Sequence, residues 1–462
     1  MTTITDATRR ARVASTVLPL ASPEAFLATT AFFSVFGGNF LRNLFGWWGW
    51  AAIVVTLVMT SVSWLAPPGR ARVLLRLPKP LLAFVAFAAA SVVWSQWAFE
   101  SALGVSALVA TAIAAVPIAL GLSWNDLVAC LSFALRWLVA LSLGFEVFVA
   151  VVVGHPVLPT WITWTTVDDA PDMLLWSRNL LLEGGQIQGV VGNSSVLAGI
   201  ALMAFIVVAV QLASRLITLR LGLVWLAMIV ITLDLTRSAT MAIAGAVVVI
   251  VAALALGRRW LWMIPRSLFY TGVWSAIALA ALVAWGFWGD ILDSLGKSDD
   301  LTGRFHIWDS VARLAVQHPL EGWGWLGYWA PWISPLNTVA TVNGVVQLHA
   351  HNAWLDLWLQ VGLLGTAVFL LFAVLAARRS LTHAVHRVRG QRNGRPAYLA
   401  ITMLPLLLLT VLAVQSLTES RLLVEEGLLL VSVLAIKLHL DPFDLETAVP
   451  SVALSERKAV FV

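Results

Sequence analysis

Apolar segments of about 20 residues recur along almost the whole chain, and each can cross the roughly 30 Å hydrocarbon core of a bilayer. Only 11% of the 462 residues are charged, less than half of the roughly 25% that is usual in soluble domains. Backbone polar groups in lipid must be satisfied within a segment, so each span is predicted to be a helix. The sequence therefore predicts an all-α, polytopic integral membrane protein.

We predict about twelve transmembrane helices, in a single membrane domain that covers residues 1–462. A short polar tail, residues 441–462, follows the last span. The predicted spans are 24–40, 44–65, 80–98, 101–121, 127–153, 195–213, 221–236, 238–256, 267–289, 353–376, 397–415 and 422–440.

Basic residues gather in the even-numbered loops between these spans. The positive-inside rule assigns those loops, the N-terminus and the tail to the cytoplasm, in a multi-pass protein of the cytoplasmic (inner) membrane. The formal charge of +5 is then explained by topology, and no nucleic-acid partner is predicted. The N-terminus shows no pattern of a cleaved signal peptide. The clearest basic loops hold Arg70, Arg72, Arg76 and Lys79, and Arg378, Arg379, Arg387, Arg389, Arg392 and Arg395.

Two predicted outer loops, 154–194 and 290–352, are too long to be simple turns. Both are rich in Trp, so they are too aromatic for disorder and are expected to fold onto the outer face of the bundle. Within the second loop, the glycine-rich stretch 322–327 is interpreted as a mobile turn.

Residues 301–315 predict an amphipathic helix at the membrane surface, because apolar residues recur at three-to-four spacing. Its expected apolar face comprises Phe305, Trp308, Val311, Ala312 and Ala315. Arg304 falls in the first turn, where a guanidinium and free N–H groups could bind a phosphate together. The alternative is an Arg that reaches toward lipid headgroups.

His351 and Asn352 precede the tenth predicted span, at the outer mouth of the bundle. A neutral imidazole there could take a proton from a hydroxyl. The alternatives are a His–Asn helix cap and a His–x–His metal pair with His349. No third ligand follows at a recognisable spacing, so neither a metal nor another cofactor is predicted. Arg237, in a tight outer turn, could be an interface anchor or a functional charge.

Several short stretches, in this order, resemble the bacterial O-antigen ligase and polymerase superfamily, which includes exopolysaccharide polymerases. They are Trp94-Ser95, Gly189 to Asn193, Thr236-Arg237-Ser238, Thr302-Gly303-Arg304 with Trp308, Pro319 to Gly324, His351-Asn352 with Leu355, Gly362 to Gly365, and Ser416 to Ser420. In that superfamily the stretch that corresponds to Thr236-Arg237-Ser238 usually reads Ser-Arg-Gly. This sequence therefore departs from the pattern at Thr236 and Ser238.

The resemblance implies a GT-C-like fold and a membrane-embedded glycosyltransferase. It implies inverting, metal-independent transfer of a glycan from an undecaprenyl-diphosphate carrier to a glycan or lipid acceptor, outside the cytoplasmic membrane. The implied catalytic residues are His351, Arg304 and Arg237. Substrate-binding residues are expected at Asn352, Asn193, Gln188, Trp308 and His349, with membrane lipids around the helices.

Two alternatives stay open. The first is a polymerase of the same superfamily, which joins repeat units on one carrier, and the sequence does not separate it from a ligase. The second is a lipid-linked glycan flippase or transporter. A flippase would carry polar residues through many spans, whereas here the candidate residues gather on one side.

Overall fold

The computed structural model describes residues 22–162, 170–261, 299–339, 341–342, 345–385 and 399–443, with short pieces between 263 and 275. Most of the predicted span 267–289, residues 290–298 of the outer loop, and nearly all of the tail 441–462 lie outside the described residues.

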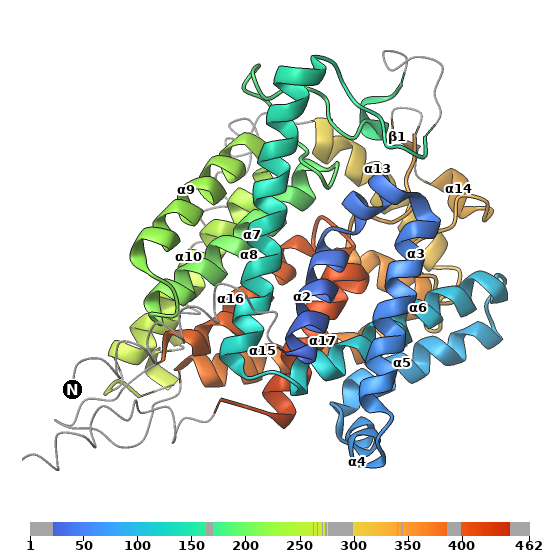
Figure 1. Ribbon diagram of the computed structural model, residues 1–462. Helices are drawn as coiled ribbons and strands as arrows, with labels where there is room; N and C mark the ends of the chain where they lie inside the picture. The colour runs from blue at the N-terminus through green and yellow to red at the C-terminus, as the bar shows by residue number, and fades with distance from the viewer. Residues whose placement is uncertain are drawn as a thin grey trace, which may run out of the picture.

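The described residues form a bundle of helices that runs between two ends of the molecule (Figure 1). The first half contains α2 (Pro23–Phe36), α3 (Gly38–Leu65), α4 (Pro68–Ala71), α5 (Lys79–Ala90), α6 (Ala98–Leu120) and α7 (Trp124–Phe148). The second contains α8 (Ser194–Ala213), α9 (Leu219–Thr236), α10 (Ala239–Trp260), α13 (Asp299–Ala315), α14 (Leu336–Val339), α15 (Ala353–Val385), α16 (Leu404–Gln415) and α17 (Glu425–Leu440). Short 3-10 or π turns are Arg72–Arg76, Ser91–Val93, Val149–Val153, Asp172–Leu174, Ala400–Met403 and Arg421–Leu423, and the strands are β1 (Thr341–Val342) and β2 (Val345–Val346).

Within the described residues, 7 helices are long and apolar enough to cross a membrane, or up to 8 if one bent pair counts as a span. The bent pair joins Pro68–Arg76 to Lys79–Val93 at 89°. Two further apolar helices, Pro23–Phe36 and Ala400–Gln415, are shorter than a full span. A helical, polytopic membrane protein is therefore confirmed, whereas the predicted count of twelve is not.

Capping side chains set where several spans begin. Asn193 starts α8, Thr218 starts α9 and Ser238 starts α10, and each side chain accepts a hydrogen bond from the backbone N–H three residues on. Such a cap satisfies one of the unpaired N–H groups of a helix N-terminus. The short polar breaks in the sequence thus fix the ends of the apolar helices.

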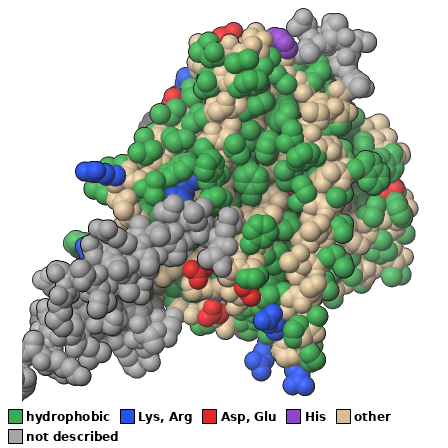
Figure 2. Space-filling view, in the orientation of Figure 1, with side chains coloured by type: hydrophobic (Ala, Val, Ile, Leu, Met, Phe, Trp, Pro, Cys, Tyr) green, Lys and Arg blue, Asp and Glu red, His purple; other side chains and the backbone are tan. Residues whose placement is uncertain are grey.

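The two ends of the bundle differ in character. The segment from α13 to β2 lies at one end and α4 at the other (Figure 1). Figure 2 shows hydrophobic side chains over most of the visible face, with one group of Lys and Arg at the end where α4 lies and others along the left side. Arg70, Arg72 and Arg76 are exposed there. The exposed Arg residues beside α4 and the segment from α13 to β2 thus lie at opposite ends of the bundle, as the predicted topology requires.

The start of α13 corrects the predicted surface helix. The helix begins at Asp299, so Arg304 lies in its second turn and not beside the free N–H groups of the first. Its most buried residues are Ile307, Val311 and Ala315, whereas the side chain of Phe305 is 60% exposed. The buried face packs on α15 and on the outer loop that follows α13, in a hydrophobic cluster of its own.

That outer loop is ordered by a break in α15. Gly362 has φ 64°, and a Cβ there would lie 2.1 Å from the carbonyl oxygen of Leu320. The break allows the N–H groups of Leu363 and Leu364 to bond to the carbonyls of Pro319 and Leu320, at 2.9 and 3.1 Å. Only glycine tolerates both this backbone conformation and this close approach.

The glycine-rich stretch continues this contact with α15, so the interpretation of residues 322–327 as a mobile turn is wrong. The N–H groups of Leu326 and Gly327 donate to the amide oxygen of Gln360, at 2.8 and 2.9 Å. Trp325 is 1% exposed, and its indole N–H donates to the carbonyl of Gly104. The loop therefore ties α15 to α6.

Candidate functional site

A buried carboxylate at the start of α15 joins three parts of the outer face. Asp356 accepts hydrogen bonds from the indole of Trp329 (3.0 Å), from the backbone N–H of Ala350 (2.9 Å) and from the hydroxyl of Ser420. The amide of Gln360, one turn further along α15, also donates to it. A buried carboxylate is stable when its oxygens are satisfied in this way. Asp356 thus fixes the loop before α15 against the loop after α16.

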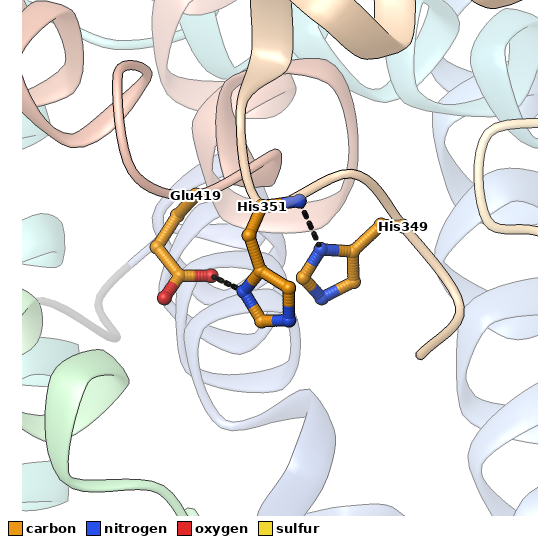
Figure 3. Close-up of side chains that lie close together, drawn as sticks. All are labelled: His349, His351 and Glu419. Carbon is orange, nitrogen blue, oxygen red and sulfur yellow. Dashed lines mark hydrogen bonds and ion pairs between the residues drawn. The ribbon is translucent and has the colours of Figure 1, made fainter. Parts of the chain in front are cut away.

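Those two loops bring His351 and Glu419 together. The Nδ1 atom of His351 lies 3.3 Å from Oε2 of Glu419 (Figure 3). Its Nε2 atom lies 3.0 Å from the side-chain oxygen of Gln347. The other oxygen of Glu419 accepts a hydrogen bond from Arg304 of α13, at 3.2 Å. One carboxylate therefore pairs with both the proposed base and the proposed phosphate-binding cation.

The carboxylate of Glu419 is ionised at neutral pH. Its burial would raise its pKa, but the neighbouring His351, His349 and Arg304 lower the pKa to about 2. For His349, burial and then the nearby His351 lower the pKa of the imidazole to about 3. A negative Glu419 therefore faces two imidazoles, of which His349 is neutral.

His349 lies against His351, and their ring centroids are 4.0 Å apart. Its Nδ1 accepts a hydrogen bond from the backbone N–H of His351, at 3.2 Å (Figure 3). On its other side the ring of Tyr328 lies 6.0 Å away. Tyr328 also lines a cavity of about 350 Å³ among apolar residues of α3, α6 and α17. The polar cluster thus adjoins an apolar cavity.

Asn352 caps α15. Its side-chain oxygen accepts hydrogen bonds from the backbone N–H groups of Trp354 and Leu355, and its amide donates to the carbonyl of Leu417. Asn352 therefore acts as the helix cap that the sequence offered as an alternative. The same side chain also joins the loop before α15 to the loop after α16. His351 just before it has φ 49°, a conformation that non-glycine residues adopt rarely and that is often found at functional sites.

Arg304, His351 and their neighbours around the start of α15 fall within a region that matches a known family, whereas Glu419 lies outside it. Residues 221–370 match the family model described as O-antigen ligase. This part of the chain is similar to that family. The predicted resemblance to the O-antigen ligase and polymerase superfamily is confirmed. A comparison with curated proteins gave no match.

Arg237 also lies in the matched region, but the structure does not bring it into contact with His351. It follows α9 in the left-handed conformation, with φ 52°, and its guanidinium donates to the carbonyl of Gly184 at 2.9 Å. The end of α9 is further held by a hydrogen bond from Ile187 N–H to Leu235. Arg237 is exposed and lies against the first outer loop.

The other predicted substrate-binding residues, Asn193, Gln188 and Trp308, make their described contacts with residues outside the cluster of His351, Glu419 and Arg304. Asn193 caps α8, and the side chain of Gln188 is 5% exposed. The backbone N–H groups of Gln188 and Gly189 donate to Glu146 of α7, which holds the first outer loop on the bundle. Trp308 packs beside Phe305, with ring centroids 5.3 Å apart.

Glu419, Gln347 and Asp356 are site residues to which no local sequence pattern assigns a role. Glu419 lies in the stretch 416–420 that carries the resemblance, yet no spacing rule links it to a His so far upstream. An acidic residue at the predicted outer end of an apolar span was the available signal. Gln347 offered none, because an uncharged amide in a long loop has no distinctive pattern.

Proposed function

We propose that this protein transfers a glycan from an undecaprenyl-diphosphate carrier to a glycan or lipid acceptor at the outer face of the cytoplasmic membrane. The observation that carries the proposal is the cluster of His351, Glu419 and Arg304, in which Arg304 and His351 lie in the region that matches the O-antigen ligase family. It combines a possible base, a carboxylate that orients it and a cation suited to phosphate.

In this mechanism Glu419 accepts the Nδ1–H of His351 and holds the imidazole in one tautomer. The Nε2 atom is then free to accept the proton of the acceptor hydroxyl. In the structure Nε2 contacts the side-chain amide of Gln347, so a hydrogen-bonding position exists there. Rotation of that amide presents its NH₂ group to an unprotonated Nε2.

The deprotonated acceptor oxygen attacks the anomeric carbon on the side opposite the diphosphate, so the bond to the diphosphate breaks and the configuration inverts. The leaving diphosphate takes the electron pair, and Arg304 stabilises its charge. We propose Arg237 as a second cation, because its exposed guanidinium lies where α9 meets the first outer loop. With two guanidinium groups in this role, the proposed transfer needs no metal.

The apolar cavity next to Tyr328 supports a lipid-linked substrate. It adjoins the imidazole pair through Tyr328 and is lined by residues of α2, α3, α6 and α17 and of the loop around Tyr328. A hydrocarbon chain held there would place its polar head near His349 and His351. The two long outer loops, 154–194 and 290–352, would cover this head from the aqueous side in the proposed topology, which has both termini in the cytoplasm.

The test is a transfer assay with purified protein in nanodiscs, a lipid-diphosphate glycan and a candidate acceptor. Released undecaprenyl diphosphate is measured with the acceptor present and absent. His351→Ala is expected to lower the rate by about 10²- to 10⁴-fold, the usual contribution of a general base. The matched control is His318→Ala, which removes a partly exposed imidazole that pairs with Glu321 at 2.9 Å outside this cluster.

Three results would contradict the proposal. A His351→Ala variant with full transfer activity would exclude this base, and loss of activity with a chelator would exclude a metal-independent reaction. Movement of the intact lipid between leaflets, without release of the diphosphate, would show that the protein is a flippase and not a glycosyltransferase. Release without any separate acceptor, with lengthening of the carrier-linked glycan, would assign the polymerase reaction in place of the ligase reaction.

A further inference from the structure

Three metal-ligating side chains converge where the sequence offered only a His–x–His pair. His349, His351 and Glu419 each provide one ligand atom, and these atoms all lie within 4.8 Å of one another (Figure 3). Donors bound to one tetrahedral ion at roughly 2.1 Å lie about 3.4 Å apart. Small side-chain rotations therefore suffice to place all three around one ion. Glu419, from the loop after α16, supplies the third ligand that local spacing did not reveal.

The hydrogen bonds of His351 favour a cation at its Nδ1. With the amide oxygen of Gln347 facing it at 3.0 Å, Nε2 of His351 carries the ring proton. The tautomer that serves transfer, with the proton on Nδ1, requires that amide to be rotated. A neutral ring then directs its Nδ1 lone pair toward Glu419 Oε2, 3.3 Å away. Nδ1 is buried and makes no hydrogen bond in the described structure. A positive ion between these two atoms would satisfy both electron-pair donors.

The surroundings of the three ligands also suit an ion. Histidines that bind metals usually donate their second N–H to an oxygen of the protein, as His351 does to Gln347. Arg304 occupies only the other oxygen of Glu419, although its charge weakens cation binding. The ion is thus expected to exchange and not to be a permanent structural metal.

We propose that His349, His351 and Glu419 form a binding site for one divalent ion of the zinc type, and that the bound ion inhibits transfer. Two imidazoles and a carboxylate are a ligand set that Zn²⁺ and Co²⁺ accept. With the ion on Nδ1, Nε2 of His351 keeps its proton and cannot take another from an acceptor hydroxyl. Binding rests on the geometry alone, whereas inhibition also rests on the proposed function.

Cobalt binding tests the site without any transfer reaction. Purified full-length protein in detergent is titrated with Co²⁺, and the visible absorption of the bound ion is followed. Wild-type protein is expected to bind about one ion with the strong absorption of low coordination number. His349→Ala and Glu419→Gln are expected to lose most of this absorption, and His318→Ala to keep it. Absence of a saturable signal in the wild type, or equal signals in the wild type and His349→Ala, would overturn the site.

Zinc inhibition is then measured in the transfer assay. Zn²⁺ is expected to lower the wild-type rate at concentrations that compete with Co²⁺, and a chelator is expected to restore it. If the protein binds Co²⁺ but Zn²⁺ does not change its transfer rate, the ion does not inhibit transfer and this part of the proposal is overturned. By contrast, a chelator-treated wild type that releases no diphosphate would contradict the proposed function. The cobalt titration would still show whether the ion-binding site exists.

Discussion

Replacing Glu419 by Gln removes the charge that Arg304 and His351 share, and it keeps the length of the side chain. In the wild type one oxygen lies 3.2 Å from Arg304 and the other 3.3 Å from His351 Nδ1. Gln has a single acceptor oxygen, so its NH₂ group must face one of these two donors. The variant therefore loses either the orientation of the imidazole or the contact with the guanidinium.

The size of the effect follows from this arrangement. A general base contributes about 10²- to 10⁴-fold, and Glu419 acts on the reaction through His351. We expect Glu419→Gln to lower kcat about 10²-fold, which corresponds to about 2.7 kcal/mol, with little change in KM. Because neighbouring imidazoles and Arg304 hold the pKa of Glu419 at about 2, the defect should be constant between about pH 6 and 8.

The assay is the release of undecaprenyl diphosphate by protein in nanodiscs, with Glu321→Gln as the matched control. Glu321 pairs with His318 at 2.9 Å in an exposed position, so the same substitution should leave kcat within about twofold. Glu419→Asp keeps the charge and should recover part of the rate. A Glu419→Gln variant that inserts normally and works within about threefold of wild type would refute the role of this carboxylate.

Three further predictions address the cation, the topology and the loop that supports the site. Arg304→Lys keeps the charge but loses the planar fork, so a large loss of transfer with normal insertion is expected, and near-normal glycan assembly would make Arg304 a surface anchor. A membrane-impermeant thiol reagent should label Gln317→Cys in intact cells but not Thr382→Cys, since both positions are exposed and Cys130 is fully buried; labelling of Thr382→Cys would overturn the orientation. Gly362→Ala should lower thermal stability by more than 1 kcal/mol, measured as a fall in Tm, because its Cβ would collide with a loop carbonyl; an unchanged Tm would contradict that packing.

The apolar periodicity of the sequence predicted the helices well where a span is continuous. Ser194–Ala213 and Leu219–Thr236 match the predicted spans closely, because caps and uncharged runs define such helices. The prediction was weaker where a span is broken. The helix pair around Pro78 bends by 89°, and the helices Pro23–Phe36 and Ala400–Gln415 are shorter than a full span. Hydropathy alone therefore overestimated the length of these helices.

The candidate site was predicted only in part because it depends on contacts between distant loops. His351, Asn352 and Arg304 were found from local patterns at helix starts. Their partner Glu419 comes from a turn between two later helices, and the buried Asp356 helps to fix that turn against the His351 loop. Local patterns encode caps and amphipathic faces, whereas long-range pairings of single polar residues leave no periodic signal.

The ties between α15 and the loop after α16 also constrain when the protein can become active during synthesis. The N–H of Ala353 donates to the carbonyl of Ser416, and the hydroxyl of Ser420 reaches Asp356. A nascent chain that ends before these residues has His351 in the membrane without its carboxylate partner. Insertion of the final helical hairpin therefore completes the site, and a ribosome-bound intermediate would be inert toward lipid-linked glycan.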